Sequence, residues 1–344
     1  MPRKIAFLIL ILAHLFALSA PAGARSAADA DRAGQFERYY GLFPDAAAQK
    51  RVSGIGNKLV AANGLNTDDF TFKVINSAEI NALALPGGYI YLFKGLTDFM
   101  PSDDELAAVI GHEMGHVTGN HIARREREQL WAMIIGAILG GPEAAIAANA
   151  ALAALPAYSQ RDEREADDSG FMYVLGANMN PYAVLVVLNK LNDADEHPDI
   201  KVNFAQHPEP SARAERIKKY LQRLQITPAV FEKEGAAEVQ DGEWTMEVRV
   251  PDGAGKPLYR AWMLAGSLYA IAQAGAVDPD KFIVDEQKGL AGIYYGDRLV
   301  YAVNWLDLAA GGETLAQKAA DYVEKLRLWA QGRANVQPAA AMSG

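Results

Sequence analysis

One short segment of this 344-residue chain contains residues suited to metal-assisted hydrolysis. It reads His112-Glu113-Met114-Gly115-His116, the pattern HExxH. Residues four apart on a helix lie about 40° from each other, so His112 and His116 project from one face and can bind a single Zn²⁺. Glu113 lies beside that face, where it can accept a proton from water and pass it to a leaving amine. We therefore predict a hydrolytic zinc site on this helix.

A catalytic zinc of this kind needs a third protein ligand and one open position. One alternative is a histidine six residues after the second, but that position holds Ile122, and His121 comes one residue early. His121 is then expected to be a polar residue near the helix end. The other alternative is a glutamate from a separate helix. Glu163 fits it, with Asp167 one turn later as the acceptor that orients a ligand histidine.

Three segments around these residues resemble a known family. They are Asn81–Gly88 (NALALPGG), Asp104–His116 (DELAAVIGHEMGH) and Glu163–Asp167 (EREAD). In this order they are similar to the HtpX-like and CAAX-prenyl-protease-like zinc metallopeptidases, and roughly residues 35–225 look most like the soluble periplasmic branch. The resemblance implies a zincin-type gluzincin fold with one zinc ion, bound by His112, His116 and Glu163. Glu113 would be the catalytic carboxylate.

The segment HPEPSAR, residues 207–213, is a further match. In periplasmic relatives the histidine corresponding to His207 can occupy the open zinc position in a resting state. Two roles stay open for Arg213: it stabilises the oxyanion of the tetrahedral intermediate, or it forms ion pairs on its helix. The chain departs from the family at Gln160, where an arginine is usual, so the role of that arginine is not predicted here.

Substrate is expected to bind as an added strand. Zincins commonly hold an extended peptide against an exposed strand, which suits unfolded or misassembled protein segments. The candidate edge strand consists of Tyr89, Ile90, Tyr91, Leu92 and Phe93, which follow a Pro-Gly-Gly turn. The alternative is an internal strand of the core.

The pattern of elements predicts an α+β chain, with a mostly helical zincin-like domain around a small sheet and a small C-terminal α/β unit. The predicted ranges are 1–24 for a signal peptide, 30–234 for the metallopeptidase domain, 235–332 for the accessory domain and 333–344 for a disordered tail. Helices are predicted at 44–63, from Ser102 onward, and at 161–176, 181–192, 211–226, 258–274 and 314–331; strands are predicted at 70–75, 89–93 and 244–250, and near 281, 292 and 300.

The N-terminus predicts export. Arg3 and Lys4 precede an apolar run from Ile5 to Leu18, and Ala22-Gly23-Ala24 offers a cleavage site. We expect a periplasmic protein, with an uncleaved membrane anchor as the alternative. The chain has no cysteine, so its stability in an oxidising compartment must come from its core. Its 42 acidic side chains exceed the 33 basic ones, which argues against a nucleic-acid partner.

These expectations combine into one function and two rivals. The chain would be an endopeptidase that cleaves unfolded or misassembled envelope proteins in quality control, with the outer-membrane assembly machinery as a possible partner. The apolar segment 131–156 is either a pair of buried helices or a hairpin in peripheral contact with a membrane. One rival function is a holdase or assembly factor with a self-inhibited zinc site. The other makes the C-terminal unit a protein-binding module served by the peptidase.

Overall fold

The computed structural model describes residues 25–125, 158–195, 207, 210–249, 256–287, 290–308 and 313–334. The predicted signal peptide, segment 131–156 and most of the predicted tail lie outside these residues. The chain divides into two compact units: Met1–Ala177 with Asn189–Arg213, and Asn178–Leu188 with Ala214–Gly344. Among the described residues, no helix has both the length and the apolarity that crossing a bilayer requires.

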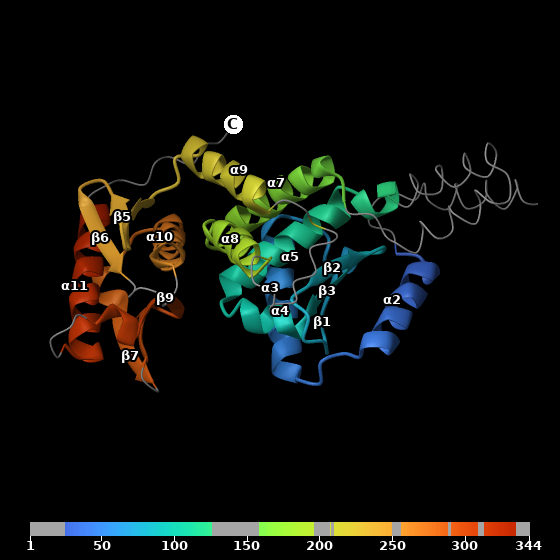
Figure 1. Cartoon of the computed structure of the whole chain (residues 1–344), viewed down its shortest axis with the longest axis horizontal. Coiled ribbons are helices and arrows are strands. Elements are labelled where there is room, and N and C mark those ends of the chain that lie inside the picture. Colours follow the sequence, from blue (N-terminus) through green and yellow to red (C-terminus); the bar gives the residue numbers. More distant parts are fainter. Residues whose placement is uncertain are drawn as a thin grey trace, which may run out of the picture. The chain divides into compact units, whose positions relative to one another are not determined.

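The first unit contains most of the described helices and one small sheet (Figure 1). Its helices are α2 (Ala27–Tyr40), α3 (Ala46–Ala62), α4 (Lys94–Phe99), α5 (Asp103–Thr118) and α7 (Gln160–Gly176), with a 3-10 turn η1 at Thr67–Asp69. The strands are β1 (Thr71–Ile75), β2 (Ala82–Leu85) and β3 (Tyr89–Phe93). Helices α8 (Ala183–Asp195) and α9 (Pro210–Arg223) contribute residues to both units.

The small sheet has the order β1-β3-β2. Strand β3 pairs in parallel with β1 and antiparallel with β2, and four of its five side chains are buried. The prediction that Tyr89–Phe93 is an exposed edge strand is therefore wrong: the backbone groups of β3 already pair on both sides, so a peptide cannot add there. The alternative, an internal core strand, is what the structure contains.

The two outer strands of this sheet differ in what covers them. On the side of β1 away from β3, the Gln49 side chain donates to Val74 O at 2.8 Å and accepts from Val74 N at 2.9 Å. Leu42 forms a bridge with Ile75 on the same side. Strand β2 lies at the other end of the sheet order and packs on α5. It is therefore the edge of this sheet next to the helix that carries the HExxH motif.

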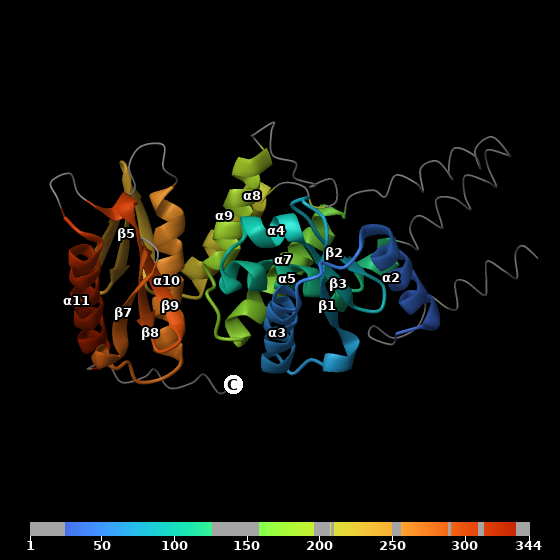
Figure 2. The same cartoon turned by 90° about the horizontal axis from the view of Figure 1, so that it is seen from below.

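The sheet lies between α2 on one side and α3 and α5 on the other (Figure 2). Phe36 and Tyr40 of α2 pack on Ile75, Tyr91 and Phe93, while the opposite face meets α3 and α5. Helix α2 was not predicted, although Ser26 and Asp29 form a capping box at its start.

Helix α5 begins at a capping box, as predicted. The Ser102 hydroxyl accepts from Glu105 N at 3.2 Å, and the Glu105 carboxylate accepts from Ser102 N at 3.0 Å. Lys190 also donates to Glu105, at 2.8 Å. Helix α7 begins in the same way at Ser159 and Asp162. Both helices thus start at a defined residue, which sets the register of the side chains that follow.

Helices α5 and α7 pack with their backbones unusually close together. A Cβ added to Gly115 would lie 2.6 Å from Ala166 O, and one added to Gly111 would lie 3.0 Å from Gly170 O. A Cβ on Gly170 would lie 2.8 Å from the backbone nitrogen of His112. Small residues on both helices therefore permit the contact, because any larger side chain would push the two backbones apart.

The second unit repeats one arrangement twice: three antiparallel strands followed by a helix. The first set is β4 (Ala229–Lys233), β5 (Ala236–Asp241), β6 (Trp244–Arg249) and α10 (Pro257–Gln273); the second is β7 (Phe282–Gln287), β8 (Leu290–Tyr295), β9 (Arg298–Val303) and α11 (Leu315–Ala334), with 3-10 turns at Pro279–Lys281 and Trp305–Asp307. The strands lie between α10 and α11 (Figure 2). The predicted α+β class is confirmed, with antiparallel sheets in this unit.

Replacing Gly115 with alanine tests the close contact of α5 and α7. The new methyl group meets the backbone of Ala166 and not a movable side chain, so we expect Gly115→Ala to lower the free energy of unfolding by about 1–3 kcal/mol. Gly54, inside α3, has open space around it, and Gly54→Ala should instead stabilise the protein by about 0.5–1 kcal/mol. Urea unfolding measures both variants. Equal effects of the two substitutions would contradict the contact.

Candidate metal centre

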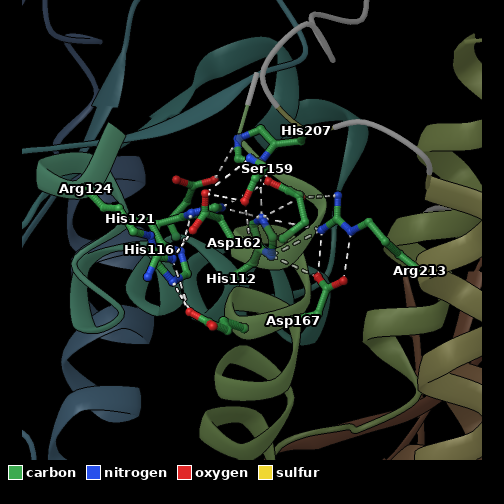
Figure 3. A network of polar contacts seen from close by, with 12 residues as sticks. His112, His116, His121, Arg124, Ser159, Asp162, Asp167, His207 and Arg213 are labelled. Atoms are coloured by element: carbon green, nitrogen blue, oxygen red, sulfur yellow. Dashed lines mark hydrogen bonds and ion pairs between the residues drawn. The ribbon is translucent and has the colours of Figure 1, made fainter. Parts of the chain in front are cut away.

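His112 and His116 project from the face of α5 that packs on α7. The Nε2 atoms of His112 and His116 lie 3.0 Å apart (Figure 3). The His116 side chain is fully buried, and 13% of the His112 side chain is exposed. The spacing in the sequence therefore places the two imidazoles together, as predicted.

Helix α7 brings Glu163 and Asp167 to the same place. Oxygens of Glu163 lie 3.4 Å from His116 Nε2 and 3.6 Å from His112 Nε2. One turn later, Asp167 Oδ1 lies 3.0 Å from the other ring nitrogen of His112, Nδ1. The structure thus joins both predicted residues to the histidine pair, with Glu163 facing the centre and Asp167 behind His112.

His207 enters the centre from outside these two helices. Its Nδ1 atom lies 3.2 Å from His112 Nε2 and 2.8 Å from Glu163 Oε1 (Figure 3). Its Nε2 atom faces Glu113 Oε1 at 3.7 Å. Together with His116, these residues form a group that could hold a metal ion.

The spacing of the donor atoms fits a tetrahedral ion. Atoms bound 2.0–2.1 Å from such an ion lie about 3.3 Å from each other. The five donor separations given above run from 2.8 to 3.6 Å. Three imidazole nitrogens and a carboxylate are also the donor types that zinc prefers. The residues present therefore fit a zinc ion.

Glu113 lies in the centre, where its Oε1 atom faces His207. Only 2% of the residue is exposed, and its Oε2 atom is buried without a hydrogen-bond partner in the described structure. The Nε2 atom of His207 is in the same condition. Unpaired buried polar atoms are costly in an ordinary core and are typical of sites that bind another group.

Arg213 is held by two carboxylates. Its Nε donates to Asp167 Oδ2 at 2.9 Å and its Nη2 to Asp167 Oδ1 at 2.7 Å, a bidentate pair. Its Nη1 forms an ion pair with Glu163 Oε2 at 2.8 Å. Of the two roles left open for Arg213, this geometry favours ion pairing over direct contact with an oxyanion.

Burial and charge set the protonation states of the centre. Burial lowers the pKa of His116 well below its usual range, so its ring is neutral and keeps a lone pair. Burial alone would raise the pKa of Asp167, but the Arg213 charge outweighs it and lowers that pKa. Burial opposes the charge on Arg213 in turn, yet Asp167 and Glu163 raise its pKa. The Asp167 carboxylate therefore stays ionised.

The structure also places His121, which was predicted to be a polar residue near the helix end, beside the centre. His121 is fully buried, and its Nδ1 atom lies 3.0 Å from Nδ1 of His116 (Figure 3). Burial, and then the nearby charge of Arg124, lower the pKa of His121. No signal in the sequence identifies this role, because His121 lies five residues after His116 and beyond the end of α5.

Two histidines on one helix, a glutamate between them and a glutamate on a facing helix define a metallopeptidase of the HExxH class. The chain belongs to Peptidase family M48, whose family model matches residues 46–221. This span includes α5, α7, His207 and Arg213. The resemblance seen in the motifs and the prediction of a zinc metallopeptidase are confirmed.

Named relatives cover parts of the chain. The beta-barrel assembly-enhancing protease of Yersinia pestis is 31% identical over 191 residues, which make up 50% of this chain and 38% of the relative. The metalloprotease LoiP of Escherichia coli (strain K12) is 30% identical over 177 residues, 49% of this chain and 69% of LoiP. The mitochondrial metalloendopeptidase OMA1 of Arabidopsis thaliana is 36% identical over 121 residues, 34% and 25% of the two chains. The match thus spans less than half of the first relative.

Replacing Arg213 with methionine tests the ion pairs. The change leaves the buried Asp167 and Glu163 carboxylates without their cation, so we expect the free energy of unfolding of the metal-free protein to fall by about 3–5 kcal/mol. Lys218, on the same helix, pairs with Glu215 at the surface, and Lys218→Met should cost less than about 1 kcal/mol. Urea unfolding compares the two. A loss below about 1 kcal/mol for Arg213→Met would contradict the ion pairs.

Proposed function

We propose that this chain is a zinc-dependent endopeptidase of the bacterial periplasm, and that it cleaves unfolded or misassembled envelope proteins. The observation that carries the proposal is the convergence of His112, His116 and Glu163 around one point, beside the Glu113 carboxylate, whose Oε2 atom has no hydrogen-bond partner in the described structure. Such a centre combines three ligands with a general base, which is the minimum that metal-assisted peptide hydrolysis requires.

His112, His116 and Glu163 would hold the zinc. When bound, the zinc ion supplies Lewis-acid polarisation of the scissile carbonyl and lowers the pKa of water. Glu113 takes a proton from the attacking water and returns it to the leaving amine. Its Oε2 atom has no hydrogen-bond partner in the described structure and is free for this exchange, while its Oε1 atom faces His207.

Asp167 and Arg213 act as positioning residues in this scheme. Asp167 accepts from His112 Nδ1, which leaves the lone pair of Nε2 available to a zinc ion that the centre would hold. Arg213 neutralises Asp167 and reaches Glu163, so the two carboxylates can lie close together without repelling each other.

His207 would close the site in the resting enzyme. Its Nδ1 occupies the fourth corner of the donor group, where water or the substrate carbonyl would otherwise bind. Zinc of this class needs that corner for catalysis, so His207 must withdraw before substrate is cleaved.

Strand β2 replaces β3 as the proposed substrate-binding strand. Phe93 N donates to Asn81 O, which makes that pair a hydrogen-bonded one, and such pairs alternate along antiparallel strands. Ala82 and Ala84 therefore direct their N–H and C=O groups away from β3. An extended peptide could pair with these groups beside α5, which would favour unfolded segments over folded ones.

Two features support the location and the substrate class. The N-terminal residues have the pattern of a signal peptide. The name of one relative refers to β-barrel assembly, and on that basis we propose that envelope proteins are substrates and that outer-membrane assembly machinery is a partner.

The position of His207 also favours one rival function, a holdase or assembly factor whose zinc site is closed. Both functions can use the outer edge of β2 to bind clients. They differ in their need for Glu113: proteolysis requires it, whereas protection of an aggregating client does not. Client protection by the Glu113→Gln variant, together with no proteolysis by the wild type, would select the rival.

Replacing Glu113 with glutamine tests the mechanism. Glutamine cannot accept the proton, so we expect casein cleavage to fall by about 10²–10⁴-fold while zinc content stays near one per chain. Glu163→Ala, in contrast, should lower zinc content because it removes a ligand. Peptidase assays and metal analysis on the same samples separate the two effects. Undiminished cleavage by Glu113→Gln would exclude the mechanism.

Replacing His207 with alanine tests the closed resting state. Three ligands remain, so zinc should stay bound, and casein cleavage should rise several-fold because the fourth position becomes free. The double variant with Glu113→Gln should be inactive, which shows that the added activity comes from the same centre. A fall in activity with loss of zinc would instead make His207 a required ligand.

A further inference from the structure

Among the described residues, no carboxylate contacts the Nδ1 atom of His116. Its counterpart His112 is oriented directly, because Asp167 Oδ1 accepts from its Nδ1 at 3.0 Å. The partner of His116 is the imidazole of His121, whose Nδ1 atom lies 3.0 Å from Nδ1 of His116. A carboxylate is reached one step later, where Nε2 of His121 lies 3.1 Å from Glu165 Oε2.

The hydrogens in this chain of contacts can be assigned from one end. A carboxylate oxygen accepts, so His121 carries its hydrogen on Nε2 and donates to Glu165. The Nδ1 atom of neutral His121 is then an acceptor, and His116 must carry its hydrogen on Nδ1. The lone pair of His116 is thereby left on Nε2, the atom that faces the metal centre.

We propose that His121 and Glu165 are positioning residues that hold His116 in its metal-binding tautomer. This inference rests on the proposed function, because it takes His116 as a zinc ligand. Ligand histidines usually need a partner on the second nitrogen, and loss of that partner typically weakens metal binding 10–100-fold. Here the partner is a second histidine, and the carboxylate acts through it.

Other contacts fix the plane of the same ring. Tyr158 stacks on the His116 ring with 3.8 Å between ring centroids and 22° between the planes. The Arg125 guanidinium in turn lies over the Tyr158 ring, 4.4 Å from its centroid. Stacking sets the plane of the ring but not which nitrogen carries the hydrogen, so the tautomer is left to His121.

A second metal ion is not needed to explain this cluster. His121, Glu165 and Asp162 form a group that could hold a cation. The Arg124 guanidinium already contacts both carboxylates, with its Nη2 bonded to Asp162 and 3.2 Å from Glu165 Oε2. Arg161 contacts the other oxygen of Glu165 at 2.7 Å. The positive charge in this place is thus supplied by the protein.

The test compares zinc affinity across four variants by chelator competition. His121→Phe keeps a ring of similar size but removes the acceptor, and we expect zinc to bind about 10–100-fold more weakly. His121→Asn should restore most of the affinity, because its amide oxygen can accept where Nδ1 did. Glu165→Ala frees His121 to take the other tautomer and should weaken binding by a smaller factor. Arg161→Gln, which removes a surface contact of the same glutamate, should leave the affinity within about twofold.

A spectroscopic readout separates orientation from a general loss of structure. In the metal-free protein labelled with ¹⁵N-histidine, His116 should carry its hydrogen on Nδ1, and the population with hydrogen on Nε2 should grow in His121→Phe and Glu165→Ala. Glu165 is partly exposed, so its variant tests the relay even where His121→Phe fails to fold. Unchanged tautomer and affinity in Glu165→Ala and in any folded His121→Phe would overturn the inference. Failure of the wild type to bind zinc would instead overturn the proposed function.

Discussion

The close contact between α5 and α7 is the constraint on which the centre depends. Gly111 and Gly115 on one helix face Ala166 and Gly170 on the other, and the backbones approach so closely that no larger side chain fits between them. Because a helix is rigid over a few turns, this contact determines where the next turn of each helix lies. The positions of His112 and His116 relative to Glu163 and Asp167 are therefore set by two rigid helices in direct contact.

The polar groups brought together by this contact balance one another's charge. Two buried carboxylates, on Glu163 and Asp167, lie beside one guanidinium, that of Arg213. Around them three imidazole nitrogens point at one place. The carboxylates and the nitrogen lone pairs repel each other at these distances, and Arg213 offsets only part of that repulsion. A divalent cation at the centre would offset the rest. The proposed zinc is thus part of the electrostatic balance of the fold as well as of its chemistry.

Local patterns predicted much of the centre, because its residues lie on helices with clear periodicity and caps. The HExxH spacing predicted the meeting of His112 and His116, and the capping box at Ser102 predicted the start of α5. Pairing order is a nonlocal property, which is why β3 was mistaken for an edge strand. Strand β2 was missed because four alternating Ala and Leu residues give little strand signal.

His121 shows a different limit of the sequence. As a candidate third ligand, His121 lies one residue before the position that the HExxHxxGxxH pattern requires. For a histidine that does not bind the metal itself, no spacing rule exists. Its role becomes visible once the turn after α5 brings its ring behind His116. Orientation by an outer residue depends on where the backbone turns back, and this lies beyond what helical periodicity can predict.

Helices α5 and α7 together would build one zinc site. A crystal structure of the zinc-loaded protein, with anomalous data collected at the zinc edge, tests it most directly. We expect one strong anomalous peak about 2.0–2.2 Å from Nε2 of His112, Nε2 of His116 and a carboxylate oxygen of Glu163. No peak at this position, or a peak bound by His121 and Glu165 in its place, would contradict it.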